Sequence, residues 1–224
     1  MGSAWMSRRS LGAVGLVLLL GAGTAACGEE PEEKSPYVAT NELCDGLFEG
    51  AAAGAVETVM GATSFDRTGP GGMGRVVESL EEGYASDRSW SRATELCELS
   101  PRGSGGIGGD GKLSFSLYAP GDIGTGRLAA GERAYGMGTE AEAGPRGARL
   151  YFECVSPTFK GSQGRPARVH GSLRLEGDLE KDSKEHREAG LTVVHAASLA
   201  VAKQLKCEDN GGLPEKPVLS ESGS

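Results

Sequence analysis

Three histidines, five cysteines and one glycine-rich loop are the residues whose types and spacing could do chemistry. The loop reads Gly-Ile-Gly-Gly-Asp-Gly-Lys from Gly106 to Lys112, which is close to the motif that cradles phosphates in nucleotide-binding proteins. That motif needs a hydroxyl residue after the lysine to hold Mg²⁺, but Leu113 stands there, and the residues beyond it alternate like a strand. We therefore interpret 106–112 as a loop without a phosphate site.

The histidines have no spacing that suits a metal ion. His170, His186 and His195 form no His-Glu-x-x-His motif, and the chain has no Cys-x-x-Cys. We expect His170 on the polar side of a strand and His186 in a charged helix start, so both are predicted to be solvated, whereas His195 borders an apolar helix stripe. No serine stands in a Gly-x-Ser-x-Gly turn or three residues before a lysine. The sequence predicts no catalytic residue, no metal, no cofactor and no enzymatic activity.

Four of the cysteines lie inside the part of the chain that should fold. Cys44 and Cys97 are 53 residues apart, and Cys154 and Cys207 are also 53 apart. Each pair would join a helix end to a strand, so we favour the pairing 44–97 and 154–207. Three pairings are possible from sequence alone. The fifth cysteine, Cys27, needs a separate explanation because an exported protein seldom leaves one thiol unpaired.

Residues 1–26 have the pattern of an export signal that ends directly before Cys27. Arg8 and Arg9 precede the apolar run Leu11–Leu20, which is too short to cross a bilayer, and small residues follow up to Ala26. This segment resembles the bacterial lipoprotein signal, in which the cysteine after the cut is acylated, although Thr24 stands where that signal usually has leucine. The alternative is an ordinary secretory cut that leaves Cys27 as a free thiol.

The export route and the start of the chain stay open. Ser-Arg-Arg-Ser-Leu from Ser7 to Leu11 resembles a twin-arginine signal, but paired arginines also occur in ordinary secretory signals. Met6 stands directly before this motif, so translation could begin at Met1 or at Met6.

Charge limits the partners that the mature chain can have. The sequence has 23 basic and 31 acidic residues, and removal of the leader takes away two arginines and no acid, so the mature balance is 21 minus 31, or −10. Nucleic acid and anionic lipid surfaces both require basic patches, so we expect neither as a partner. Residues 27–40 are acidic and contain two prolines, which predicts a disordered tether.

A single globular domain is predicted over residues 41–212, followed by a flexible tail over 213–224. Apolar residues at helical spacing indicate helices, and strict alternation indicates half-buried strands. Helices are expected at 41–61, 75–82 and 182–207, and strands at 90–99, 112–118, 133–137, 148–155 and 167–176. Asp182 with Glu185 could cap the last helix, and Ser198 on its apolar stripe could bond back to the Val194 carbonyl.

These elements predict an α+β fold with an antiparallel sheet of about four to five strands packed against helices. Aromatic residues make up only 5% of the chain, so the few present are candidates for a contact surface. One interpretation is a cleft beside the sheet lined by Tyr118, Tyr135, Tyr151 and Trp90, although ordinary strand packing is the more common reason for such residues.

The leader ending at Cys27, the acidic tether and the cysteine motifs around Cys44, Cys154 and Cys207 together resemble the small secreted lipoproteins of the actinomycete, Streptomyces-like, type. This resemblance implies a domain held at the outer face of the cytoplasmic membrane by a lipid on Cys27, and it supplies no catalytic residue. We expect a binding or accessory module of the cell envelope, recognising an unidentified ligand or envelope protein; the alternative is an envelope-acting enzyme of unrecognised type.

Overall fold

A computed structural model describes residues 35–67, 69, 71–103, 109–123, 128–177 and 181–222. The leader, Cys27 and most of the predicted tether lie outside the described residues, as do 106–108 of the glycine-rich loop. From Ser35 onward the chain forms one compact unit.

The centre of this unit is a six-stranded antiparallel sheet with the strand order β3-β4-β8-β7-β6-β5. A separate two-stranded sheet pairs β1 with β2. The strands are β1 (Tyr37–Ala39), β2 (Ser64–Asp66), β3 (Thr94–Leu99), β4 (Gly111–Leu117), β5 (Arg133–Tyr135), β6 (Glu140–Gly144), β7 (Gly147–Cys154) and β8 (Ala167–Leu175). The α+β class is confirmed, but the predicted number of strands is too low.

Strand β6 is the main omission from the predicted sheet. Its sequence Glu-Ala-Glu-Ala-Gly contains no β-branched or aromatic residue, which are the types that mark strands. Its buried side is made only of Ala141 and Ala143, opposite Leu150 and Ala148 of β7. Alanine side chains are enough to fill the space beneath β6, because the neighbouring strand β7 and helix α3 supply the larger side chains.

The helices are α1 (Ala51–Met60), α2 (Met73–Ala85) and α3 (Lys184–Gln204), with short 3₁₀ turns η1 (Thr40–Asp45), η2 (Pro120–Asp122) and η4 (Glu208–Gly212). The predicted helix from Asn41 to Gly61 is therefore two elements. Cys44 and Gly46 have positive φ angles of 53° and 80°, and Gly50 also has a positive φ, so the backbone leaves the helical region between η1 and α1.

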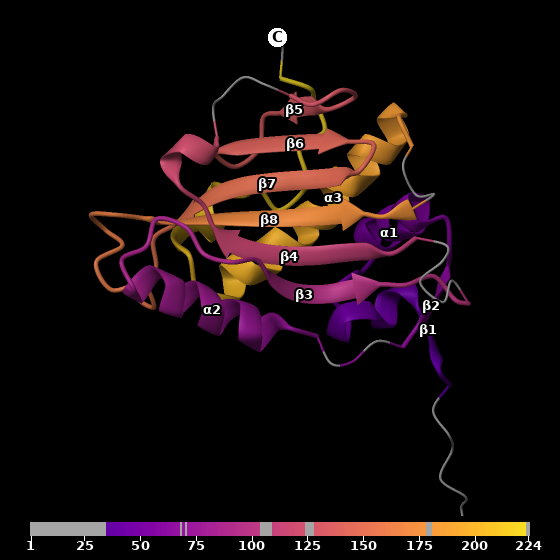
Figure 1. Cartoon of the computed structure of the whole chain (residues 1–224), viewed down its shortest axis with the longest axis horizontal. Helices are drawn as coiled ribbons and strands as arrows, with labels where there is room; N and C mark the ends of the chain where they lie inside the picture. The colour runs from indigo at the N-terminus through magenta and orange to yellow at the C-terminus, as the bar shows by residue number, and fades with distance from the viewer. Residues whose placement is uncertain are drawn as a thin grey trace, which may run out of the picture. The chain divides into compact units, whose positions relative to one another are not determined.

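Helices α2 and α3 pack on one face of the six-stranded sheet, and α1 packs against α3. Figure 1 looks onto the other face, with α3 behind the strands. A Cβ atom at Gly171 of β8 would lie 2.6 Å from Ser198 Oγ of α3, so only glycine permits this approach. Ser198 is fully buried, and its hydroxyl has no hydrogen-bond partner among the described residues, so the predicted bond to Val194 is wrong.

The cap of α3 differs by one residue from the prediction. Ser183 is the N-cap and accepts the backbone N–H of His186, whereas Asp182 bonds Arg187 through its carboxylate at 2.5 Å. With Ser183 as the cap, the third helical residue is His186 instead of Glu185, so no capping box forms.

The compact unit extends beyond 41–212 at both ends. Tyr37–Ala39 of the predicted tether form β1, and the C-terminal segment (residues 213–222) returns along α3 to strand β5. There Ser222 donates its backbone N–H to the Ala134 carbonyl, and Leu213 is buried. Backbone pairing and burial attach both segments to the rest of the domain.

Two disulfides join Cys44 to Cys97 and Cys154 to Cys207, which is the nearest-neighbour pairing. The first links η1 to β3. The second links the end of β7 to the residue that follows the last turn of α3. Each closes a loop with a sequence separation of 53 residues, so the helical layer is covalently attached to the sheet at two places.

Candidate functional site

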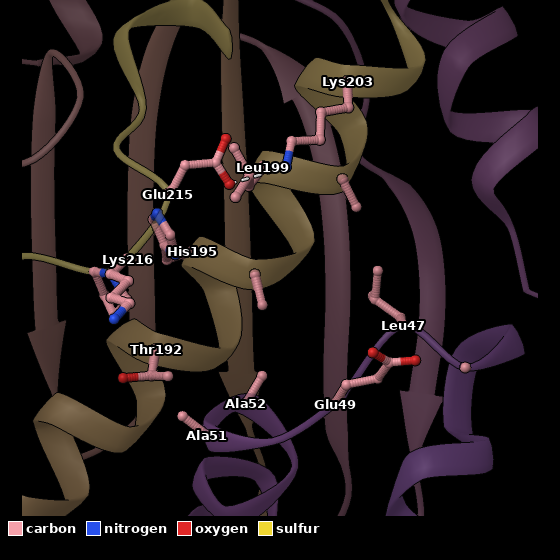
Figure 2. Close-up of a pocket in the computed structure, with 14 residues that line it drawn as sticks. Leu47, Glu49, Ala51, Ala52, Thr192, His195, Leu199, Lys203, Glu215 and Lys216 are labelled. Carbon is pink, nitrogen blue, oxygen red and sulfur yellow. Dashed lines mark hydrogen bonds and ion pairs between the residues drawn. The ribbon is translucent and has the colours of Figure 1, made fainter.

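A groove of about 600 Å³ lies between α3, the chain around the start of α1, and the C-terminal segment. Figure 2 shows this α1–α3 groove, with α3 running along it. The residues that line it are Gly46, Leu47, Glu49, Ala51, Ala52, Thr192, His195, Ala196, Leu199, Ala200, Lys203, Glu215, Lys216 and Pro217. Its volume lies within the range that small-molecule sites occupy in proteins.

The floor of the groove is one stripe of α3. Thr192, Ala196, Leu199, Ala200 and Lys203 fall on neighbouring turns, so they share the side of the helix that faces α1 and the C-terminal segment. The stripe is recessed because its alanines leave room that larger side chains would fill.

Polar contacts hold the C-terminal segment against α3 and so form one wall of the groove. His195 Nε2 lies 2.8 Å from the Pro214 carbonyl oxygen, and Lys203 Nζ lies 3.1 Å from Glu215 Oε2. Asn210 Nδ2 donates to Glu215 Oε1 at 3.2 Å. Burial lowers the pKa of His195, and its hydrogen bond to Pro214 partly opposes this shift. His195 lies in α3, on the apolar stripe that the sequence predicts it to border, and its Nε2 is hydrogen-bonded.

A second polar arrangement lies on the sheet face that Figure 1 shows, which we call the polar face. Ser116 of β4, His170 of β8 and Tyr151 of β7 stand opposite one another in register. The His170 and Tyr151 rings are stacked with centroids 4.4 Å apart, and Tyr118 meets Tyr151 edge-on at 5.1 Å. This row joins side chains from three neighbouring strands.

His170 is half-buried, whereas the prediction was a solvated side chain. The Tyr151 ring covers it, its Nε2 is buried without a hydrogen-bond partner among the described residues, and burial, with the nearby Arg149 charge, lowers its pKa to about 4. Ser116 Oγ lies 3.5 Å from His170 Nδ1, which resembles a nucleophile beside its base. A pKa near 4 makes the imidazole a weak base at neutral pH, so this pair is poorly suited to activating the serine.

The predicted aromatic cleft forms only in part. Tyr118 and Tyr151 come together on the polar face, but both are almost fully buried. Tyr135 lies opposite Ala141 on the helix side of the sheet, and burial raises its pKa. Trp90 lies between α2 and β3 with 56% of its surface exposed. The four residues do not share one cleft.

Next to this row, Arg149 lies between two carboxylates on the polar face. Its guanidinium donates to Glu142 Oε2 at 2.8 Å and to Glu132 Oε1 at 2.9 Å. Burial raises the pKa of Glu142, although Arg149 opposes this shift. Because one cation holds both carboxylates, they serve as an ion-pair network rather than as an acid and a base.

The other predicted candidates fall into structural roles. His186 is 3% exposed, so the prediction that it is solvated is wrong, and burial lowers its pKa. Lys112, at the end of the glycine-rich loop, lies in strand β4, and its ammonium is 3.8 Å from a carboxylate oxygen of both Glu98 and Glu176. Lys112, the lysine of the phosphate-loop-like motif, therefore forms surface ion pairs.

Within the described residues, no group of three or more His, Cys, Asp or Glu side chains could hold a metal ion. No helix in the same part of the chain is long and apolar enough to span a membrane. Comparison with protein-family models, with curated proteins and with solved structures gives no match for this chain.

The groove is the feature that could not be predicted from the sequence. Its members come from three separate segments, and the small residues of α3 indicate only a helix-forming, alanine-rich stretch. One signal was present: Ala196 and Ala200 place a small apolar strip on the side of α3 that faces away from the sheet. That strip indicates a surface against which something can pack.

Proposed function

We propose that this protein is a membrane-anchored extracytoplasmic lipoprotein that works as a binding or accessory module of the cell envelope. The anchor is a lipid on Cys27, and the location is the outer face of the cytoplasmic membrane. Two observations support this proposal: the leader that ends at Cys27, and two disulfides, which persist in oxidising compartments.

The α1–α3 groove is the observation that carries the binding role. It combines a mostly apolar floor with a few charged side chains at its margins, which is the general composition of ligand sites. The nearest arrangement to a catalytic one, Ser116 with His170, pairs a serine with an imidazole of low basicity. Binding is therefore the function that the geometry supports best.

The anchor is tested by labelling cells with a palmitate analogue and fractionating them. The wild-type chain should take up label and sediment with membranes, whereas Cys27→Ser should be unlabelled and leave the membrane fraction. Cys44→Ala/Cys97→Ala is the matched control, because it removes cysteines that form a disulfide and should keep the label. Unlabelled wild-type protein in the medium would refute the anchor.

A further inference from the structure

We propose that the Cys44–Cys97 disulfide is a redox site that a dithiol reduces selectively, and that its reduction loosens the wall of the α1–α3 groove formed by residues 46–49. The redox site stands on the structure around the bridge, whereas its effect on binding rests on the role proposed above for the groove. The Cys154–Cys207 disulfide has the same sequence separation of 53 residues and provides an internal reference.

The two bridges differ in how far their cysteines are buried. Cys154 is fully buried, and Cys97 and Cys207 are 6% and 8% exposed, whereas Cys44 is half-buried. A disulfide is cut when a thiolate attacks one of its sulfurs, so the bridge with the more accessible cysteine reacts first. Cys44 is therefore the point of attack.

A pocket beside the first bridge gives a thiol room to approach. Its volume is about 210 Å³, several times the volume of a water molecule. Two carboxylates and one guanidinium line it, so its charged side chains sum to one negative charge, and a neutral dithiol is favoured over an anionic one. The lining residues are Val38, Glu42, Leu43, Cys44, Asp45, Arg67 and Gly69.

The backbone at Cys44 is in the left-handed region, which residues other than glycine rarely adopt. Cys44 and Asp45 have φ angles of 53° and 60°. Such a conformation persists only where the surrounding structure fixes it, and the disulfide is one of these restraints. Cys207 itself has an ordinary φ of −62°, although Lys206 and Asp209 near it are left-handed. Cutting the first bridge therefore lets its own cysteine leave an unfavourable conformation.

The partner cysteine lies at the edge of the sheet. Strand β3 is an edge strand, and its pairing with β4 is interrupted by a bulge between Glu95 and Cys97. In contrast, Cys154 ends the interior strand β7, which pairs with both β6 and β8. A bulge on an edge strand leaves the local pairing incomplete, so Cys97 can move away from Cys44 once the bond is broken.

The dithiol alone balances the exchange. Its first thiolate attacks Cys44 Sγ, forms a mixed disulfide there and displaces Cys97 as a thiolate, which takes up a proton. The second thiolate of the reagent then attacks the reagent sulfur of the mixed disulfide and releases the Cys44 thiolate. Two electrons pass from the dithiol to the bridge, and the dithiol becomes a disulfide.

The first bridge is connected to the groove through a short turn. The backbone N–H groups of Gly46 and Leu47 both donate to the Leu43 carbonyl oxygen, at 3.0 and 3.2 Å, and Cys44 lies inside this turn. Gly46, Leu47 and Glu49 line the α1–α3 groove. Reduction removes the covalent attachment of the turn to β3, so these two hydrogen bonds should open more often.

Limited reduction of the purified full chain tests the redox site. Dithiothreitol is added under native conditions, free thiols are alkylated with iodoacetamide, and mass spectrometry measures the label at each cysteine. We expect Cys44 and Cys97 to be labelled at least about tenfold faster than Cys154 and Cys207, and the rates to become equal in urea. Equal rates in the native protein, or a tenfold difference that persists in urea, would overturn the proposal.

Filling the pocket tests the route of attack. Gly69 lines the pocket, and a Cβ added there would meet no atom within 4 Å. Gly69→Leu should slow reduction of the first bridge about tenfold, whereas Gly121→Leu, at an exposed position of η2 with equal free space, should leave it unchanged. Urea unfolding without reductant shows whether each variant is folded. An unchanged rate in folded Gly69→Leu would contradict attack through the pocket, and if this variant fails to fold, the comparison of native and urea rates decides.

Hydrogen exchange measured by NMR tests the effect on the groove. The variant Cys44→Ala/Cys97→Ala stands for the reduced protein, and its Gly46 and Leu47 amides should exchange at least about tenfold faster than those of Cys154→Ala/Cys207→Ala. Both variants lose a bridge of the same sequence separation, so a general loss of stability would affect them equally. Equal exchange at these amides in the two variants would refute the coupling to the groove.

Failure of this inference can be separated from failure of the proposed function. Limited reduction requires neither a ligand nor the anchor, and palmitate labelling reports on Cys27 alone. Selective reduction of a protein that takes up no palmitate refutes the anchor only. A palmitate-labelled protein whose two bridges are reduced at equal rates refutes the redox site only.

Discussion

His170 shows how burial changes the chemistry of a single residue. It stands on the polar side of a strand, yet the Tyr151 ring stacks on it and its Nε2 has no partner among the described residues. Between about pH 4 and 6.5, the neutral form of His170 is therefore favoured in the folded chain and the charged form in the unfolded chain.

His170 should make the protein unstable in acid. Its pKa is about 4 in the folded chain and about 6.5 when unfolded, so between these values the unfolded state binds more protons. The free energy of unfolding should then fall by up to about 3 kcal/mol as the pH drops from 6.5 to 4. His186 and His195 act in the same direction because burial lowers their pKa as well.

The variant His170→Phe isolates this contribution. Phenylalanine keeps the ring stacked on Tyr151 and removes the titrating group, so the loss of stability between pH 6.5 and about 4 should be smaller than in the wild type. Urea unfolding at several pH values measures the difference. Parallel pH profiles for the two proteins would contradict the assignment.

At the scale of elements, Gly147 controls the turn between β6 and β7. Its φ is 130°, and a Cβ there would overlap the Leu173 carbonyl oxygen of β8. Any side chain would push β7 and β8 apart at the centre of the sheet.

Gly147→Ala should destabilise the protein by about 3 kcal/mol or more, because it combines backbone strain with a clash against a strand. Gly54→Ala is the matched control: Gly54 lies within α1, a Cβ added there would meet no atom within 4 Å, and the variant should gain about 0.5 to 1 kcal/mol. Thermal unfolding distinguishes the two. Equal effects at both positions would show that the contact with Leu173 does not matter.

The strands that alternate clearly could be predicted from the sequence, and those that lack strand-forming residues could not. Lys112–Tyr118 and Ala167–Glu176 alternate leucine, valine or phenylalanine with polar residues, and both are strands in the sheet. Strand β6 has only alanines on its buried side, and β1 is three residues long. The α1–α3 groove and the row of Ser116, His170 and Tyr151 could not be predicted from the sequence, because each joins residues that are far apart in the chain.

At the scale of the whole molecule, the disulfides connect the helical layer to different regions of the sheet. Cys97 lies in β3 at one edge of the sheet, and Cys154 ends β7 near its centre. Their loops have equal sequence separations, so loop-closure entropy predicts equal contributions.

Removing either disulfide by a double alanine substitution should lower the free energy of unfolding by about 4 kcal/mol. Urea unfolding of Cys44→Ala/Cys97→Ala and of Cys154→Ala/Cys207→Ala, each beside the wild type, gives the two values. A difference of more than about 2 kcal/mol between them would mean that native-state packing, rather than loop closure, dominates the effect.

The two ends of the compact unit meet opposite edges of the six-stranded sheet. The N-terminal β1 pairs with β2, which bridges through Phe65 to Pro101 just after β3, whereas Glu221 bridges to Tyr135 of β5. Five strand spacings of about 4.8 Å separate β3 from β5, or roughly 24 Å. If the chain is tethered through its N-terminal side, an epitope fused after Ser224 would leave from the edge farther from the tether, where antibodies or a displayed cargo could reach it.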